Sequence, residues 1–414
     1  GKSTNMMGRD TMRPRRTIVV VAVVTALTNA TGIGVLVISP AIRRVLDLRA
    51  DAFGLLLSVG LGFGILGSLA SGWLADRGYL KASFGAAFGI LVASYAVCML
   101  PASYPVYLLA LACAGLANSG ALTLANVTAA RAFPDGSRKA LTGIMLAHSI
   151  GGVVAAPLWQ MLFEIFGTRF PTESALQLVF LAAACVCATA GALFFAFPLP
   201  TQLAGRKTPA AAEPGDRASL WGLPLVVVCA FAALQAGAYN SVFGWIPDFA
   251  TRTFAPNPFP VSWILSGISL SYVIGRLILL RLPERLPDLR IVFVCAGTGA
   301  LLFGAAFGST SQYSMGILCV VGGLVLSADW PSIFSHTARL FPVHAGKAIA
   351  MAGASAGVMS FVLPPFMGFI AEQTGSLRAG MMVPPLLFGV LSVSALSWER
   401  YLRRARKHPL NTES

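Results

Sequence analysis

The sequence predicts an all-α integral membrane protein in which twelve transmembrane helices form two pseudo-symmetric bundles of six. Three observations carry this prediction: the composition, a series of long apolar runs, and a pattern that recurs in the two halves of the chain. Hydrophobic residues make up 56% of the 414 residues and charged residues only 11%, whereas soluble globular chains carry roughly 25% charged residues. So few charges cannot cover a water-soluble protein of this length. A bilayer must therefore be the solvent, which excludes a cytosolic enzyme, a nucleic-acid-binding domain and a disordered tail protein.

Twelve apolar runs are long enough to cross a bilayer, whose core of about 30 Å requires about 20 residues of helix. They are continuously apolar, whereas the strands of a membrane barrel would alternate over about ten residues. Glycines within the runs either let helices pack closely or simply reflect the glycine-rich composition. The runs lie near 18–40, 52–75, 82–100, 105–130, 140–163, 175–197, 221–247, 261–282, 290–308, 313–338, 346–371 and 379–398.

The basic residues predict how these runs are oriented. If both termini lie on one side, 23 of the 30 lysines and arginines fall on that side, six fall on the other, and Arg276 lies inside a run. Positively charged loops stay in the cytoplasm. We therefore expect both termini in the cytoplasm, in the cell (inner) membrane. The net charge of +14 is then a topology signal and a contact with anionic lipid, not a nucleic-acid site.

A polar stretch rich in Pro, Ala and Gly divides the chain into two halves at residues 198–220. It predicts a cytoplasmic linker between an N-terminal bundle (18–197) and a C-terminal bundle (221–398), with cytoplasmic tails at 1–17 and 399–414. At a constant shift of 208 residues, Gly67 falls on Gly275, and residues 131–134 (RAFP) fall on 339–342 (RLFP). This indicates an internal parallel repeat, which places a substrate site near the bilayer midplane between the halves.

The loop after the second run carries a recognisable motif. Residues 72–81 read GWLADRGYLK and resemble the signature of the major facilitator superfamily: Gly, three residues, Asp, Arg or Lys, one residue, Gly, then basic residues. Here Gly78 follows Arg77 at once, and the equivalent positions of the second half keep only Glu284 and Arg285. The segment from Arg131 to Pro157 is also similar to that family. The resemblance covers the whole chain and implies alternating access by rocking of two six-helix bundles.

Charged residues at the cytoplasmic helix ends are candidates for conformational gating. A carboxylate there can hold an arginine or a helix N-terminus across the interface between the bundles, and this contact must break as the halves rock. The alternative is a solvated turn without an energetic role. The candidates are Asp76, Arg77, Arg131, Glu284, Arg285 and Arg339.

Arg276 is the most informative charge within a run, because an ionisable group at mid-membrane costs on the order of 2.5–3.5 kcal/mol. It lies in the eighth run, eight residues before Glu284. An arginine at that offset resembles the substrate-binding arginine of monocarboxylate transporters, oxalate–formate antiporters and nitrate porters. A guanidinium can grip a carboxylate through two parallel hydrogen bonds. Alternatively, Arg276 pairs permanently with Asp329 or with backbone carbonyls.

Asp329, Ser332 and His336 share one stripe of the tenth run, because they are spaced by three and seven residues. A carboxylate and an imidazole in that stripe could carry a coupling proton, since histidine titrates near neutral pH. The alternatives are a fixed Asp329–Arg276 pair and an ordinary hydrogen bond of His336. Polar residues of the first, fourth and seventh runs complete the expected substrate lining, or else join helices to each other: Asn29, Asn118, Asn126, Gln235, Tyr239 and Asn240.

These patterns favour a secondary transporter over other membrane proteins. The sequence has no His-Glu-x-x-His motif, no nucleophile segment with a histidine partner and no phosphate-binding loop, so we expect neither an enzyme nor an ATP-driven pump, and no cofactor or metal. The predicted substrate is a small organic solute, most simply an organic anion such as a monocarboxylate, with proton coupling left open. A neutral sugar or other polar metabolite permease, or a drug or metabolite exporter, is the alternative. A monomer suffices for either.

Overall fold

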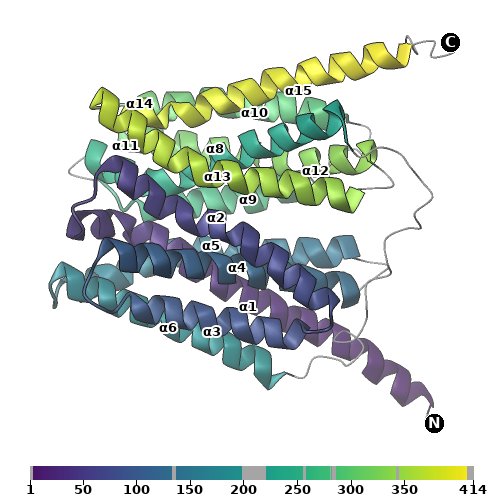
Figure 1. Ribbon diagram of the computed structural model, residues 1–414, viewed down its shortest axis with the longest axis horizontal. Coiled ribbons are helices and arrows are strands. Elements are labelled where there is room, and N and C mark those ends of the chain that lie inside the picture. The colour runs from purple at the N-terminus through teal and green to yellow at the C-terminus, as the bar shows by residue number, and fades with distance from the viewer. Residues whose placement is uncertain are drawn as a thin grey trace. The chain divides into compact units, whose positions relative to one another are not determined.

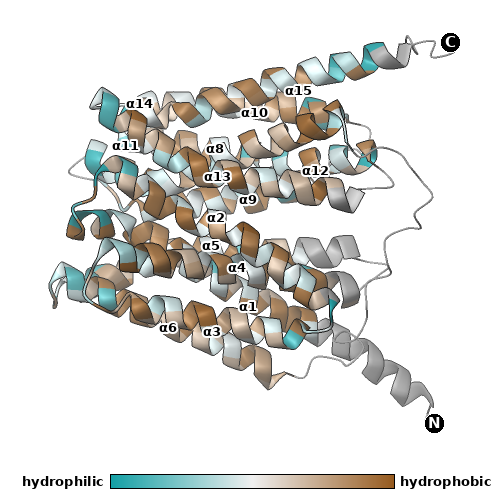
Figure 2. Ribbon diagram, in the orientation of Figure 1, coloured by the Kyte–Doolittle hydropathy of each residue, from teal (hydrophilic) through white to brown (hydrophobic). Residues whose placement is uncertain are grey.

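The computed structural model describes residues 3–132, 137–197, 221–254, 258–279, 281, 286–341 and 345–407. It describes their side chains except at residues 3–16, 76, 130–131, 137–142, 345–347 and 405–407. Regular structure in these ranges is entirely helical (Figure 1). Within the described residues, twelve helical segments are long and apolar enough to span a membrane, which confirms the predicted fold class. Figure 2 shows apolar residues along the helices and hydrophilic residues gathered towards helix ends.

The chain divides into two compact units, and the first contains residues 1–211 together with 259–270. Within it, α1 packs on α5 and α6, α2 packs on α4, and α3 packs on α4 and α6. The first turns of α9 belong to this unit, and there the Ser266 hydroxyl donates a hydrogen bond of 2.8 Å to the Val153 carbonyl of α5. Its helices are α1 (Ser3–Val45), α2 (Ala50–Asp76), α3 (Leu80–Val97), α4 (Tyr104–Ala132), α5 (Ser137–Gly167) and α6 (Thr172–Ala196).

The second unit contains residues 212–258 and 271–414. Residues 259–270 thus group with the first unit. The predicted linker at 198–220 lies outside the described residues, and the predicted domain bounds remain predictions. In this unit α8 packs on α13 and α15, and α10 packs on α11, α12 and α15. Its helices are α8 (Leu223–Thr253), the part of α9 (Ser262–Leu279) that follows residue 270, α10 (Asp288–Gly308), α11 (Gln312–Leu326), α12 (Asp329–Leu340), α13 (Ala345–Thr374), α14 (Leu377–Met381) and α15 (Val383–Lys407).

The tenth span is interrupted where the sequence predicted one continuous run. α11 ends at Leu326 and α12 begins at Asp329. Pro331 explains the interruption, because a proline lacks the N–H that would bond to the carbonyl four residues earlier, and its ring clashes with that carbonyl. That carbonyl belongs to Ser327, within the break. The proline therefore places Asp329 at the start of a new helix.

Glycines allow equivalent close approaches in the two halves. A Cβ atom added to Gly67 of α2 would overlap the Leu116 carbonyl of α4, and one added to Gly275 of α9 would overlap Leu324 and Ser327 at the end of α11. Gly275 and Leu324 lie 208 residues after Gly67 and Leu116, the shift that the sequence predicted. The same contact therefore recurs in both repeats, and at these positions the glycines serve packing.

Gly78 ends α2 in the motif after the second run. Its φ of 92° lies in the left-handed region, which glycine adopts without steric cost. The Gly78 N–H bonds to the Ala75 carbonyl and the Tyr79 N–H to the Leu74 carbonyl, each at 3.0 Å. This is the Schellman arrangement that closes a helix C-terminus, and it explains why a glycine directly follows Arg77.

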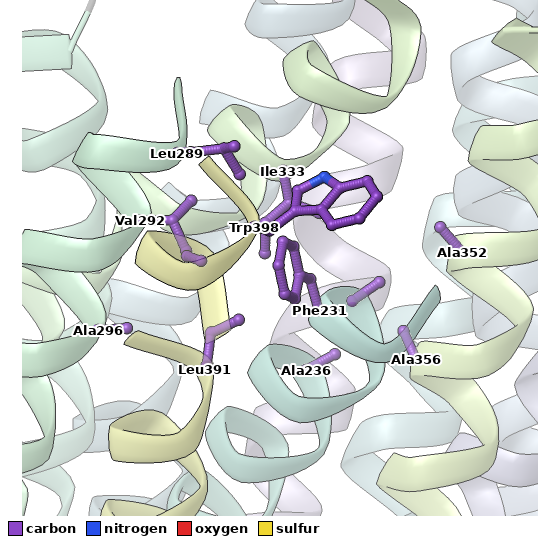
Figure 3. Packing of buried hydrophobic residues seen from close by; sticks show 12 residues of the cluster. Phe231, Ala236, Leu289, Val292, Ala296, Ile333, Ala352, Ala356, Leu391 and Trp398 are labelled. Atoms are coloured by element: carbon purple, nitrogen blue, oxygen red, sulfur yellow. The ribbon is translucent and has the colours of Figure 1, made fainter. Parts of the chain in front are cut away.

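A buried apolar cluster joins α8, α10, α12, α13 and α15 in the second unit (Figure 3). Trp398 of α15 lies there beside Phe231 and Ile333, with its ring nitrogen buried and without a hydrogen-bond partner among the described residues. Alanines at six further positions let the helices approach, as is usual in membrane bundles. The cluster positions α12 and the polar residues at its two ends.

Candidate functional site

Arg276 lies where α9 packs against the break in the tenth span. Gly275 has no side chain, so α9 approaches Leu324 and Ser327 closely, and this brings Arg276 next to the break. The Arg276 guanidinium carbon lies 5.6 Å from the ring centroid of Tyr272, one turn earlier on α9. Arg276 stands in the last turn of α9, nearer the helix end than the predicted run implied. A cation there also stabilises the helix dipole.

Asp329 is completely buried at the first position of α12. Neither carboxylate oxygen has a hydrogen-bond partner in the described part of the chain, so Asp329 forms no hydrogen bond with Arg276 there. Both Asp329 and Arg276 interact electrostatically with the Tyr272 hydroxyl, and Asp329 also interacts with Cys295 of α10. A buried carboxylate without partners is costly, so this site needs a proton or a ligand to complete it.

Two tyrosines, Tyr239 and Tyr272, lie beside Arg276 and Asp329. We call these four residues the Arg276 cluster. The ring of Tyr239 on α8 lies 4.9 Å from that of Tyr272, between centroids, and its hydroxyl also interacts with Arg276. The Tyr272 hydroxyl is buried and has no hydrogen-bond partner among the residues described. The structure thus brings together the predicted Tyr239, Arg276 and Asp329. Sequence analysis missed Tyr272, although its spacing of four residues from Arg276 places the two on one helical face.

The two predicted amides of the second unit are Gln235 and Asn240, both on α8. Asn240 donates 2.9 Å from its Nδ2 to the Ser360 hydroxyl of α13, and this bond joins two helices. Gln235 is only 3% exposed. Both residues lie on α8 with Tyr239, and their roles in substrate binding remain predictions.

The predicted amides of the first unit lie on α1 and α4. Asn29 donates from Nδ2 to the His148 carbonyl of α5 at 2.7 Å. The Asn118 amide nitrogen lies 3.5 Å from the place of a Cβ on Gly32, so it faces α1. The Asn126 side-chain oxygen is buried without a hydrogen-bond partner within the described ranges. Asn126 thus has an unused hydrogen-bond acceptor, while Asn29 already joins two helices, and substrate binding by these amides remains a prediction.

His336 lies at the other end of α12, beside a cavity of about 330 Å³. Its Nε2 atom is buried and has no hydrogen-bond partner among the described residues. The imidazole interacts electrostatically with Asp288 and Arg339. We call this the α12-end cavity; it is lined by Pro287, Asp288, Leu289, His336, Arg339, Leu340, Glu399, Leu402 and Arg403.

Two of the predicted gating residues have described side chains. The Arg339 Nε lies 3.6 Å from the Asp288 carboxylate of α10, a partner within the same unit that sequence analysis did not propose. The Arg77 guanidinium carbon lies 3.6 Å from the ring centroid of Trp73, one turn earlier on α2. The side chains of Asp76, Arg131, Glu284 and Arg285 lie outside the described residues, so gating by these six remains a prediction.

Comparisons with known proteins identify the family. The sequence profile of the Major Facilitator Superfamily matches residues 19–255 and 247–414. The chain therefore belongs to the Major Facilitator Superfamily, and it is a multi-pass membrane transporter, not an enzyme. No curated protein matches the sequence.

Solved structures share the fold at low sequence identity. A bacterial homologue of the human lysosomal transporter Spinster is 15% identical, with a TM-score of 0.73 over 94% of this chain and 97% of that one. The xylose transporter XylE from E. coli is 12% identical, with a TM-score of 0.73 over 93% and 95%. The nucleoside transporter NupG is 13% identical, with a TM-score of 0.69 over 93% and 98%. One of these proteins is named for xylose and another for nucleosides, so the likeness extends to the fold and not to the solute.

Proposed function

We propose that this protein is a secondary active transporter that moves a small organic anion, most simply a monocarboxylate, together with a proton by alternating access. The Arg276 cluster is the observation that carries the proposal. It combines one guanidinium, two phenolic hydroxyls and a carboxylate that has no hydrogen-bond partner in the described chain. The guanidinium and the hydroxyls are hydrogen-bond donors, which suit an anion.

The charge balance of the cluster supports proton coupling. Before a solute binds, the cluster holds one cation, Arg276, and one ionisable carboxylate, Asp329, and both interact with Tyr272. With Asp329 ionised, these two charges sum to zero. An incoming carboxylate would leave one uncompensated negative charge in a site of low dielectric, which is expensive. A proton on Asp329 restores neutrality. The expected stoichiometry is therefore one proton for each monovalent anion.

A thermal-shift screen of the purified protein tests the substrate class. The panel contains mono- and dicarboxylates, nitrate, hexoses, nucleosides, amino acids and organic cations. We expect a monocarboxylate to raise the melting temperature of the wild type and of Arg281→Gln, and to have no effect on Arg276→Gln. Arg281 is the matched control because it is an exposed arginine just beyond the end of α9.

Two results would contradict an anion at Arg276. One is stabilisation by a carboxylate that Arg276→Gln retains in full. The other is stabilisation by a hexose or an amine alone, which would favour a neutral-solute permease or an exporter of the same superfamily. Arg276 would then act as a structural cation at the end of α9.

A further inference from the structure

Asp329 lies at one end of a polar seam between α10 and α12, and the α12-end cavity lies at the other. Asp288 of α10 interacts electrostatically with His336, and Cys295, two turns further along α10, interacts with Asp329. Since His336 follows Asp329 by two turns on α12, the two helices run antiparallel and face each other along this whole length. The seam therefore extends from the α12-end cavity to the buried carboxylate, and the buried apolar residues Val292 and Ile333 of the same two helices lie along this length.

The seam contains polar atoms between its two ends. Ser332 is 4% exposed, and its hydroxyl donates 2.8 Å to the Ala328 carbonyl, which leaves the hydroxyl oxygen able to accept a hydrogen bond. The Nε1 atom of Trp398 has no hydrogen-bond partner within the described residues, and Trp398 packs against the same stretch of α12 (Figure 3). Buried polar groups of this kind are usually satisfied by internal water.

We propose that the proton bound by Asp329 enters from the α12-end cavity and passes along the α10–α12 seam through His336 and Ser332. This inference rests on the proposed proton coupling and adds a route that is separate from the Arg276 guanidinium, where the anion binds. His336 accepts a proton from a hydronium ion in the cavity on one ring nitrogen and releases a proton inwards from the other, so that it returns to neutral imidazole. The cavity thus becomes the proton entrance, on the side where α12 and α15 end.

The distance along the seam requires intermediates. Seven residues of helix separate His336 and Asp329, about 10 Å along the axis, which exceeds one hydrogen bond. Ser332 lies between them on the same stripe, four residues before His336 and three after Asp329, and hydroxyl and water oxygens can relay a proton over such a gap. Histidine is suited to the outer position because its usual pKa is about 6.5.

Charged residues of both signs surround His336 at the cavity. Asp288 of α10 and Glu399 of α15 supply two carboxylates at the cavity, while Arg339 of α12 and Arg403 of α15 supply two cations. Glu399 is paired with Arg403 and, at 3.1 Å, with Arg290 of α10. The Asp288 carboxylate, which lies 3.6 Å from Arg339, favours a charged imidazole at His336, whereas Arg339 disfavours it.

The arrival of the proton at Asp329 can be timed by infrared spectroscopy after a rapid drop in pH, using purified protein without substrate. A protonated carboxyl group has a C=O stretching band, and Asp329→Asn identifies the part of that band that belongs to Asp329. We expect His336→Phe to slow the appearance of this band by at least roughly tenfold at an unchanged final amplitude. His148→Phe, the same change in α5, is the control and should keep the wild-type rate. Ser332→Ala should also slow the band.

The outcomes separate the route from the proposed function. If His336→Phe and Ser332→Ala both give the band at the wild-type rate, the proton reaches Asp329 by another path and the inference is wrong, although proton coupling stands. If Asp329→Asn removes no band, Asp329 does not titrate and the proposed coupling fails as well. Should His336→Phe not fold, His336→Gln replaces it: slowed arrival supports the route, and an unchanged rate overturns it.

Discussion

Asp329 combines complete burial with a carboxylate that has no hydrogen-bond partner in the described chain. Tyr272 and Cys295 interact electrostatically with Asp329, and neither is a cation. A buried carboxylate without hydrogen bonds lowers stability, and natural proteins retain it where it serves a function. At the scale of single residues, the proposal therefore predicts that replacing Asp329 by a neutral residue stabilises the fold but abolishes proton coupling.

Asp329→Asn should raise the free energy of unfolding at pH 8 by about 1–3 kcal/mol, because it removes a buried charge and keeps the shape of the side chain. Lowering the pH should reduce the difference in the free energy of unfolding between Asp329→Asn and the wild type, since a protonated Asp329 is also neutral. Thermal unfolding of both proteins in detergent from pH 5 to pH 8 measures this. Asp288→Asn is the control: it loses the ion pair with Arg339 and should not be stabilised. A less stable Asp329→Asn at every pH would mean that Asp329 has a structural partner.

At the scale of helices, the sequence predicted the spans well and their irregularities poorly. Continuous apolar runs determine that a helix crosses the bilayer, so all twelve spans were found. The break between Leu326 and Asp329 depends on one proline, Pro331, which the hydropathy of the run concealed. The 208-residue shift predicted the equivalence of Gly67 and Gly275, and the structure gives both the same packing role.

The sequence predicted the charged residues of the candidate site but not all of their neighbours. Arg276 and Asp329 stand out because charges are rare in apolar runs. Tyr272 does not stand out, since an aromatic residue fits any membrane helix, and only its position between the two charges reveals it. The Asp288 partner of Arg339 depends on the packing of α10 against α12, which no local pattern encodes.

Glycine substitutions test the helix packing in both repeats. Gly67→Ala and Gly275→Ala should each lower the melting temperature and the transport rate, because the added Cβ would overlap backbone or Ser327 atoms of the partner helix. Overpacking of this kind costs about 1–3 kcal/mol. Gly89→Ala and Gly353→Ala are matched controls, since nothing lies within 4 Å of an added Cβ there, and should leave both quantities unchanged. Equal effects at all four positions would refute the specific role of Gly67 and Gly275.

At the scale of the whole molecule, the basic residues predict the orientation in the membrane. Both termini should lie in the cytoplasm, because 23 of the 30 lysines and arginines fall on their side of the spans. Reporter fusions that are active only in the cytoplasm or only outside it, placed after residues 48, 78 and 407, test this. We expect cytoplasmic activity at residues 78 and 407 and external activity at residue 48. The reverse pattern would place the α12-end cavity, the proposed proton entrance, on the opposite side of the membrane.

Coupled transport is the central claim, and flux into proteoliposomes with an imposed pH difference tests it most directly. With the carboxylate identified by the thermal-shift screen and an outside pH one unit lower, one-to-one symport should accumulate the anion by up to about tenfold. A protonophore should abolish the accumulation. Asp329→Asn should let the anion equilibrate without accumulation, and Arg276→Gln should not transport it. Accumulation that persists in Asp329→Asn, or that ignores the pH difference, would contradict the account.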